Sequence, residues 1–506
     1  MSIYAPFLKE LKDQRALERR LLDQTDIHSG EFHQRRSAWS SLRVGEDEKV
    51  ERFARAYLAA LEEKTVPQRA DYIEVELRKA GFRITEELVK KSPEELMQRD
   101  HYKPLNPGAK VYMRIENTVF AFVVGSKALE SGANLVGTHI DSPTLSGTIR
   151  GIKEDNNRCY LSLTCSYGSE PIDWVNQELE LYLHGTIGKE RTRKRVVKFT
   201  LGGDYGFIVP TGSLHLTNPE TKPTQLDIIL GTIPFPGHNV PGRSIKLNLL
   251  RRLNEQFGIT EDSLQGTDIY AVPKHKPGFG GIDFSTINSY GQDNFSTAIP
   301  LLGAVKNLRH PEYTFITAFF EGEETGRMKK FVDYMENIVF PDIASLCTKD
   351  SNARYPMAGN LWSWFLDVIG PKPITENVPG THDPRDSPFP GSGVVILQHS
   401  GDSGASDGYK PTPEFLSATR TFLERQYIPH QIALMGCRGK NTMGISDIFH
   451  PDEGHGVDIG ICCDSMHRLS EQVYVIDGYS LAKALKRFAN IGNHQTYMPL
   501  PASRSR

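Results

Sequence analysis

The sequence predicts an α/β fold: a mostly parallel sheet flanked by helices, with an inserted β-rich domain. Apolar strand-like segments alternate with helical ones after residue 290, which is typical of a parallel sheet covered on both faces. Short segments that alternate apolar and polar residues dominate residues 148–265 instead. Because 506 residues suffice for two or three domains, we expect one domain built from residues 1–147 and 273–506, interrupted by a second at residues 148–272.

Residues 46–100 are predicted to be helical. The stretches EDEKVERFARAYLAALEEK and QRADYIEVELRKAGF carry apolar residues at helical spacing, and the second ends at a glycine. The next stretch, KVYMRIENTVFAFVVG, alternates around Glu-Asn and predicts a hairpin. ANLVGTHIDSP then predicts a short apolar strand that ends in polar residues.

Three short alternating segments predict the strands of the inserted domain: NRCYLSLTCSYG, QELELYLHGTI and RVVKFTLGG. The Pro- and Gly-rich stretch KHKPGFGGID, residues 274–283, would then return the chain to the first domain.

After residue 290 the chain alternates strands and helices. The expected strands are YTFITAFF, NLWSWFLDVIG, GSGVVILQHS, HQIALMG and GVDIGICC. The expected helices are NFSTAIPLLGAVKNL, TPEFLSATRTFLERQ and DGYSLAKALKRFANIG.

Composition excludes several classes of partner. The formal net charge of −3 provides no overall field that would attract nucleic acid or an anionic membrane. The basic run KERTRKR, residues 189–195, is interpreted as a solvated hairpin end. No stretch approaches the roughly 18 apolar residues of a membrane helix, and the charged start does not resemble a secretory signal. The six cysteines show no CxxC spacing, so we expect a reducing, cytoplasmic setting.

Acidic residues and histidines follow several of the predicted strands. In an open α/β sheet, ligands bind beyond the carboxyl ends of the strands, so these residues are expected at one edge. They are His139 and Asp141, then Glu321, Glu323 and Glu324, then Asp367, and finally Asp464 and His467, with Asp293 opening the helix that follows GQDN.

Each of these residues has an ordinary explanation when it is taken alone. Asp293 would serve as a helix cap, and the paired glutamates would lie on a solvated surface. Asp367 is harder to explain in this way, because a carboxylate inside the apolar WSWFLDVIG needs a strong partner. That partner is either a metal or a buried Arg or Lys.

The combination of ligand types suits two metal ions. Zinc and similar divalent ions accept histidine nitrogen and carboxylate oxygen, and two ions about 3.5–4 Å apart need a bridging carboxylate. Because His139 and Asp141 are two residues apart, we expect one to ligate and the other to orient it. The adjacent glutamates would divide in the same manner, one facing a metal and one facing water.

These segments resemble the M18 family of metallo-aminopeptidases, which includes the aspartyl aminopeptidases. The resemblance runs in order along most of the chain and is strongest at GTHIDSP, GQDN, EGEETG, FLDV and DIGICCDSMHRLSE. It implies an α/β catalytic domain, a β-rich dimerisation domain, and a homo-oligomer that builds from dimers to dodecamers. It also implies hydrolysis of the N-terminal residue of a peptide substrate.

The resemblance implies a metal-binding role for five positions. Asp293 would bridge two divalent ions, with His139 and Asp367 completing one site and Glu324 and His467 the other. Zinc is the implied metal, although manganese or cobalt accepts the same ligands.

Two further positions have implied roles. Glu323 would be the general base that takes a proton from water, and Asp141 would support His139.

The sequence also departs from the aspartyl aminopeptidases. Trp174 is present in PIDWVNQEL, but the histidine that accompanies it in those enzymes is absent. Leu397 stands where they carry a lysine suited to an acidic side chain, and GPKP follows the DVI stretch in place of Ala-His. We therefore expect the preference for an acidic N-terminal residue to be absent or weak.

Two other functions remain open. Related two-metal carboxypeptidases and deacylases need an arginine for the substrate carboxylate, and Arg327 is the one candidate near the site segments. An inactive homologue kept as a scaffold should have lost ligands, whereas all the implied positions are present here. Four other features are interpreted as structural: the HPDEGHG loop at 450–456, His184, the Cys462–Cys463 pair and the aromatic LWSWF.

Overall fold

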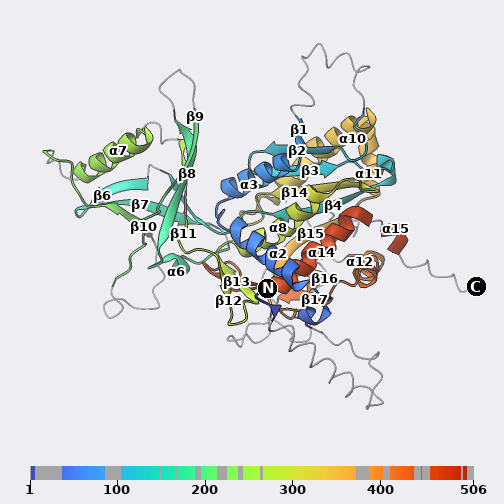
Figure 1. Cartoon of the computed structure of the whole chain (residues 1–506). Helices are drawn as coiled ribbons and strands as arrows, with labels where there is room; N and C mark the ends of the chain where they lie inside the picture. Colours follow the sequence, from blue (N-terminus) through green and yellow to red (C-terminus); the bar gives the residue numbers. More distant parts are fainter. Residues whose placement is uncertain are drawn as a thin grey trace, which may run out of the picture.

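The computed structural model is a mixed α/β structure that contains two separate sheets (Figure 1). It describes residues 2–5, 37–85, 104–148, 151–166, 168–187, 195–212, 225–237, 243–261, 266–371, 387–402, 411–437, 446, 449, 456–491 and 494–497. Among the described helices, none is both long enough and apolar enough to cross a lipid bilayer.

The larger sheet has twelve strands in the described part of the chain. Its main path runs β1 (Arg83–Ile84), β2 (Lys110–Ile115), β3 (Thr118–Val123), β14 (Thr314–Phe320), β4 (Ala133–His139), β15 (Trp362–Ile369), β18 (Gly456–Asp464), β19 (Glu471–Tyr474), β13 (Thr286–Ser289) and β12 (Gly278–Gly280). Two more strands lie off this path, where β16 (Val394–Asp402) pairs with β18 and with β17 (His430–Cys437).

The strand directions correct one expectation. The central neighbours β14, β4, β15 and β18 are parallel to one another. Most pairs at the flanks are antiparallel, because β2 and β3 form a hairpin with β14 beside it, and because β18, β19, β13 and β12 pair in alternating directions. The exceptions in the described part of the chain are β1 with β2 and β16 with β17, which are parallel. A strand joined to the next by a tight turn must run back beside it. The sheet is therefore mixed rather than mostly parallel.

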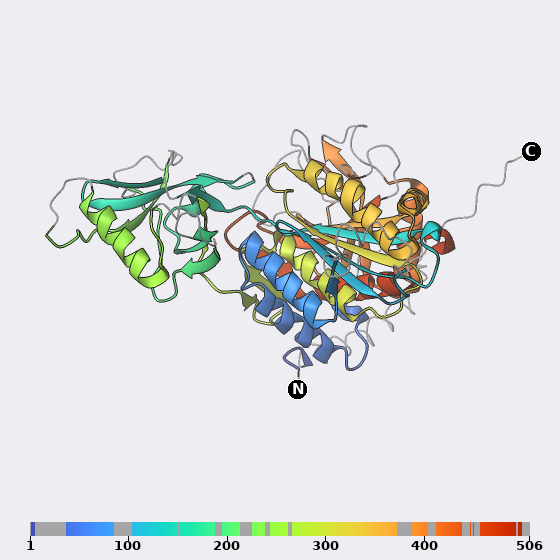
Figure 2. The ribbon, with the colours of Figure 1, turned by 90° about the horizontal axis from the view of Figure 1, so that it is seen from above.

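Helices cover both faces of this sheet, and Figure 2 shows α10 on the side opposite α2 and α3. The first face carries η1 (Ala38–Ser41), α2 (Asp47–Ala60), α3 (Val66–Lys79), α8 (Gln292–Asn307), α12 (Pro413–Arg425), α14 (Val475–Ile491) and α15 (His494–Tyr497). The second face carries the turns Leu129–Ser131, Met335–Val339 and Ser351–Ala353, with α9 (Met328–Tyr334), α10 (Phe340–Thr348) and α11 (Arg354–Gly359).

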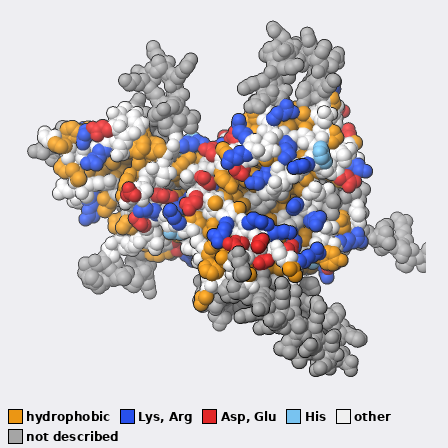
Figure 3. Space-filling view, in the orientation of Figure 1, with side chains coloured by type: hydrophobic (Ala, Val, Ile, Leu, Met, Phe, Trp, Pro, Cys, Tyr) orange, Lys and Arg blue, Asp and Glu red, His pale blue; other side chains and the backbone are white. Residues whose placement is uncertain are grey.

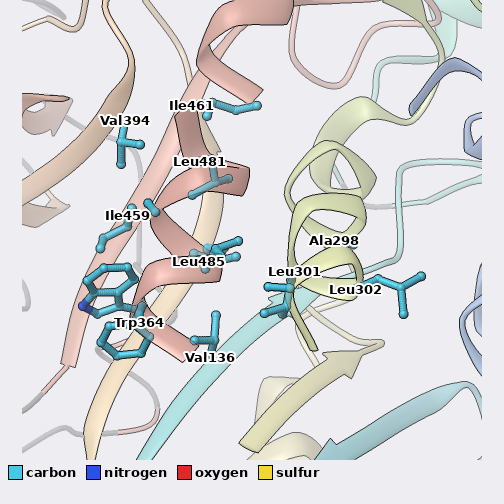
Figure 4. Packing of buried hydrophobic residues seen from close by; sticks show 14 of the residues in the cluster. Val136, Ala298, Leu301, Leu302, Trp364, Val394, Ile459, Ile461, Leu481 and Leu485 are labelled. Atoms are coloured by element: carbon cyan, nitrogen blue, oxygen red, sulfur yellow. The ribbon is translucent and has the colours of Figure 1, made fainter. Parts of the chain in front are cut away.

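Successive side chains of β15 point to opposite faces of the sheet, which explains why apolar residues pack on both faces. Trp362 and Trp364 point to the first face and Phe365 to the second, and all three are fully buried. Figure 4 shows Leu301 of α8 and Leu485 of α14 near the sheet residues of the first face. Burial on both faces is what a central parallel strand requires.

The second sheet has its own apolar core and lies beside the larger sheet with its covering helices, which we call the first body (Figure 2). It runs β10 (Leu226–Gly231), β7 (Arg158–Cys165), β5 (Leu145–Thr148), β11 (Asp268–Pro273), β8 (Leu179–Ile187) and β9 (Arg195–Leu201), with β6 (Ile152–Asp155) beside β7. The helices α6 (Pro171–Trp174) and α7 (Ser244–Phe257) accompany it. We call β5 to β11 with these helices the second-sheet body. The chain enters through β5 and leaves through β11, which are antiparallel neighbours.

Most expected elements of the first body are present. The hairpin turns at Glu116, the strands from ANLVGTH to GVDIGICC form, and the helices after residue 290 begin and end close to their expected positions. The expectation of helix throughout residues 46–100 was wrong at β1, where Arg83–Ile84 pairs with β2 as a strand. Other elements were not expected, among them the helices between residues 328 and 359, α7 in the β-rich region, the strands β6, β10 and β19, and a short hairpin, β12–β13, that begins within the expected 274–283 linker. Residues 86–100, 189–194 and 450–455 lie outside the described residues.

Candidate metal centre

Five elements bring the candidate ligands to one edge of the larger sheet. His139 ends β4, Asp367 lies in β15, Glu324 follows β14, and His467 follows β18. Because these four strands are parallel neighbours, their carboxyl ends meet at the same edge. Asp293 reaches the edge from the start of α8.

The first group consists of His139, Asp293 and Asp367. The Nε2 atom of His139 lies 3.2 Å from Oδ1 of Asp293 and 3.5 Å from Oδ1 of Asp367. Three donor atoms that lie this close together and come from three elements can converge on one cation.

The second group consists of Asp293, Glu324 and His467. The Nε2 atom of His467 lies 3.0 Å from Oδ2 of Asp293 and 3.0 Å from Oε1 of Glu324. Asp293 therefore belongs to both groups and presents one carboxylate oxygen to each histidine.

The donor set fits divalent cations. Asp293 is 2% exposed and Glu324 3%, and Oδ1 of Asp293 and Oε1 of Glu324 accept no well-directed hydrogen bond within the described residues, although a histidine Nε2 lies 3.2 Å and 3.0 Å away, respectively. A buried carboxylate oxygen without a partner is costly, and a cation between the carboxylates and the imidazoles would satisfy it. Histidine nitrogen with carboxylate oxygen is a ligand set that zinc accepts.

The titration of the second group reflects crowded negative charge. Burial, reinforced by Asp293, raises the pKa of Glu324 to about 8. Burial opposes protonation of His467, but the carboxylates of Asp293 and Glu324 outweigh it and raise the pKa of His467 to about 11. Positive charge is thus strongly favoured here, whether it is carried by a proton or by a metal.

Glu323 lies next to the ligands without belonging to either group. Burial is the largest cause that raises the pKa of Glu323. The charge of His139 lowers this pKa, whereas Asp367 and Asp293 raise it, and the result is a pKa of about 7. A carboxyl group with a pKa near neutrality can both accept and return a proton.

Asp141 contacts His139 in a manner that the sequence alone did not indicate. The backbone carbonyl of Asp141 lies 3.1 Å from Nδ1 of His139, closer than its carboxylate Oδ1 at 3.5 Å. Its Oδ2 instead accepts the backbone N–H groups of Gly322 and Glu324, each at 3.1 Å. Asp141 therefore links the His139 strand to the loop that carries the glutamates.

Two other acidic candidates lie outside the groups. Glu321 accepts a hydrogen bond of 2.9 Å from Nδ2 of Asn117, and Asp464 accepts one from the hydroxyl of Tyr474. Neither belongs to a group of potential ligands among the described residues.

Two supporting residues were missed by sequence reasoning. Arg69 of α3 is 1% exposed and donates to the carbonyls of Ile140 and Gly291, which flank two of the ligands. Its position on the buried face of an amphipathic helix was the available signal. Glu471, also 1% exposed, accepts backbone N–H groups near Asp293 and His467.

Among the features interpreted as structural, none that the structure describes belongs to a group of potential ligands. His184 lies within β8, and Cys462 and Cys463 are buried in β18. Leu397 is 5% exposed and belongs to an apolar cluster with Ile369 and Cys462.

Comparisons with known proteins identify one family over most of the chain. The profile of the family described as "Aminopeptidase I zinc metalloprotease (M18)" matches residues 78–489. A probable M18 family aminopeptidase 1 of Clostridium acetobutylicum is 27% identical over 431 residues, which is 81% of this chain and 88% of that protein.

Solved structures show the same fold. Aminopeptidase I from Clostridium acetobutylicum matches with a TM-score of 0.78 at 23% identity, covering 91% of this chain and all of that one. The S. cerevisiae mApe1 dodecamer matches with a TM-score of 0.66 at 16% identity, covering 87% of this chain and 97% of its own. Since the family profile spans most of the chain, including every candidate ligand, the chain belongs to the M18 family of zinc metallo-aminopeptidases.

Proposed function

We propose that this chain removes the N-terminal residue of peptides with two metal ions held by a shared carboxylate. The observation that carries the proposal is Asp293, which offers one oxygen to each of the two ligand groups. A carboxylate that bridges two ions is the arrangement that two-metal hydrolysis requires.

The ligand assignment follows from the two groups. His139 and Asp367 would complete one site, and Glu324 and His467 the other, each together with Asp293. When bound, the ions polarise the scissile carbonyl and lower the pKa of water. Zinc is the metal of the family description, and the number of ions is part of the proposal.

Glu323 is proposed as the general base. It lies beside both groups, and its raised pKa suits a group that accepts the proton of the attacking water and returns it to the leaving amine. Asp141 would keep the glutamate loop in place through its bonds to Gly322 and Glu324.

The proposed specificity is broad, with little preference for an acidic N-terminal residue. The support is Leu397, an apolar side chain in an apolar cluster where an acid-selective enzyme would need a cation. The peptide's free amine would pair with the carboxylates of the centre and so fix cleavage at the first bond.

We also propose that the chain forms homo-oligomers through the second-sheet body. Its visible face carries apolar side chains (Figure 3), and large exposed apolar patches usually mark interfaces. The exposed large apolar residues in the described part of the second-sheet body are Ile172, Tyr205, Ile208, Ile233 and Leu247. The structural neighbour from S. cerevisiae is a dodecamer.

Metal reconstitution tests the proposal. Chelator-treated protein should hydrolyse no aminoacyl-anilide, and activity should rise until two equivalents of zinc are bound per chain. Leu- and Lys-anilides should react within about tenfold of Asp- and Glu-anilides. Saturation at one equivalent would contradict the two-ion assignment, and a large rate advantage for acidic residues would contradict the broad specificity.

Glu323→Gln separates chemistry from binding. The variant should bind zinc as the wild type does while losing about 10²–10⁴-fold in kcat, because only proton transfer is removed. Two outcomes with the wild type would favour the other functions.

Hydrolysis of N-acyl amino acids instead of aminoacyl-anilides would favour the deacylase alternative. Arg327, exposed at the start of α9, is the candidate partner for the substrate carboxylate in that case. Two bound metals in an inactive wild type would favour the scaffold alternative.

A further inference from the structure

The buried carboxylate of Glu471 joins the two segments that carry the ligands of the second group. Its Oε2 accepts the backbone N–H groups of Gln292 at 2.6 Å and Asp293 at 3.1 Å. Its Oε1 accepts the backbone N–H of His467 at 2.8 Å. One side chain thus connects Asp293 and His467, which lie 174 positions apart in the sequence.

Neither segment is held by regular secondary structure. Asp293 has φ −79° and ψ 108°, outside the helical range although it lies within the bounds of α8. His467 has φ 66°, a left-handed conformation that is uncommon for non-glycine residues and that local constraints stabilise. The hydrogen bonds to Glu471 supply such a constraint at both places.

Glu471 also frees the side chain of Asp293 for another role. The first N–H groups of a helix need acceptors, and an acidic residue at this position often supplies its own carboxylate. Here Glu471 accepts the N–H groups of Gln292 and Asp293 from a neighbouring strand. The Asp293 carboxylate can therefore face His139 and His467 instead.

The backbone around Glu471 is itself held by hydrogen bonds and strand pairing. The side-chain amide of Gln292 donates to the carbonyls of Glu471 at 2.6 Å and of Ile287 at 3.0 Å, and the hydroxyl of Tyr57 donates to Oε1 of Gln292 at 2.8 Å. Antiparallel pairing of β19 with β13 and β18 holds the strand on both sides. The carboxylate therefore has a defined position from which it can hold others.

We propose that Glu471 is a positioning residue of the metal centre, which sets the distance between the bridging Asp293 and His467 so that both can bind zinc. The inference rests on the proposed function, because it takes these two residues as ligands. A carboxylate is required rather than an amide, since all three partners are N–H donors and only a carboxylate offers two acceptor oxygens.

The test compares Glu471→Gln with Asp477→Asn. Asp477 is another fully buried carboxylate that accepts two backbone N–H groups, from Gly391 and Gly393, at the start of α14 and outside the ligand groups. Both variants lose an acceptor for backbone N–H groups, so a merely structural effect should lower the melting temperature of both.

The deciding measurement is the dissociation constant for Zn²⁺ of the chelator-treated protein, measured by competition with a chromophoric chelator. Glu471→Gln should bind zinc about 10–100-fold more weakly, the range typical when a residue that supports a ligand is lost. Asp477→Asn should stay within about twofold of the wild type. At saturating zinc, Glu471→Gln should lose kcat with little change in KM, because the substrate contacts remain while the ligand geometry does not.

A folded Glu471→Gln with zinc affinity and kcat within about twofold of wild type would overturn the proposal. Should this variant not fold, hydrogen exchange of the chelator-treated wild type decides instead. The amides of Gln292, Asp293 and His467 should then exchange slowly, and rapid exchange would contradict the bonds to Glu471. A wild type that binds zinc but cleaves no aminoacyl-anilide would refute the proposed function and leave the zinc comparison valid.

Discussion

Gly168 illustrates, at the scale of single residues, how little space surrounds the candidate ligands. A Cβ at this position would lie 2.8 Å from Oε2 of Glu324 and 3.3 Å from Nδ1 of His467. Gly168 also has φ +89°, a backbone conformation that residues with a side chain rarely adopt. A glycine of the second-sheet body thus borders the ligands of the first body.

Gly168→Ala should therefore weaken the second metal site. We expect the zinc affinity to fall by about tenfold or more, because a displaced ligand loses its geometry. Competition with a chelator measures this. Gly231→Ala is the control in the same body, since a Cβ there meets no heavy atom within 4 Å. Equal zinc affinities for the two variants would show that the Gly168 backbone yields without moving Glu324 or His467.

Three of the five candidate ligands were recognisable from sequence because they end or follow a short apolar segment. His139, Glu324 and His467 come at or just after predicted strand ends, where a parallel sheet collects side chains. Glu471 could not be recognised in the same way. Its partners are backbone N–H groups of distant residues, and no side-chain pattern records them.

At the scale of elements, α3 supports the site through one buried cation. Arg69 donates to the carbonyls of Ile140 and Gly291 and to the hydroxyl of Ser142. The helix begins with Thr65 and Gln68 in a reciprocal cap, which fixes where Arg69 points. The helix therefore links the β4 loop with the start of α8.

Arg69→Met should lower the free energy of unfolding by about 2–5 kcal/mol, because several buried acceptors would lose their donor together. Urea denaturation measures the change. Arg55→Met on the neighbouring α2 is the control; its side chain is 59% exposed and pairs with Glu51, so the loss should stay below about 1 kcal/mol. Similar losses for both variants would mean that Arg69 contributes no more than a surface residue.

The start of α14 predicts a pH dependence of stability. Burial, opposed by the N–H groups of Gly393 and Gly391, raises the pKa of Asp477 from its ordinary 3.8 to about 7. The folded state holds the proton of Asp477 more tightly than the unfolded chain does. The contribution of this group to the free energy of unfolding is therefore fully present below the pKa that Asp477 has in the unfolded chain. It is lost as the pH rises through the folded pKa.

Asp477→Asn should remove this dependence, since an amide does not titrate. Relative to wild type, its free energy of unfolding should increase from about pH 5 to about pH 8, by up to about 3 kcal/mol for a shift of this size. Urea denaturation at both pH values gives the difference. A difference that stays constant between them would show that Asp477 does not titrate in this range.

Elements with strong periodicity were predictable, whereas those defined by partners were not. The helices α2, α12 and α14 follow from their own apolar spacing. Strand direction depends on neighbours that are distant in sequence, so the antiparallel pairing of β18 with β19 could not be read from GVDIGICC. The same holds for β12, where three residues pair within a stretch rich in Gly and Pro.

At the scale of the whole molecule, the two bodies meet beside the candidate metal centre. Arg468, next to His467, forms an ion pair of 2.5 Å with Asp173 of α6. Trp174 packs edge-on against Tyr290, whose hydroxyl donates to the carbonyl of Pro143. The second-sheet body therefore contacts the segments on both sides of the ligands.

The proposed assembly is testable on the intact protein. Mass photometry should find even multiples of the 56.7 kDa chain, and Ile233→Asp should shift the distribution towards single chains, because Ile233 is 63% exposed on the second-sheet body. Val44→Asp is the control, since Val44 is 87% exposed on the first body. A monomeric wild type, or an equal effect of both variants, would exclude this interface.

The entry and exit of the second-sheet body through the adjacent strands β5 and β11 bear on protein engineering. Chain ends that lie side by side generally accept a replacement module. A foreign domain grafted between them could therefore leave the larger sheet intact. Such a chimera would nevertheless lack Gly168 and Asp173, which lie beside the candidate ligands. It should therefore fold but bind metal more weakly than the natural chain.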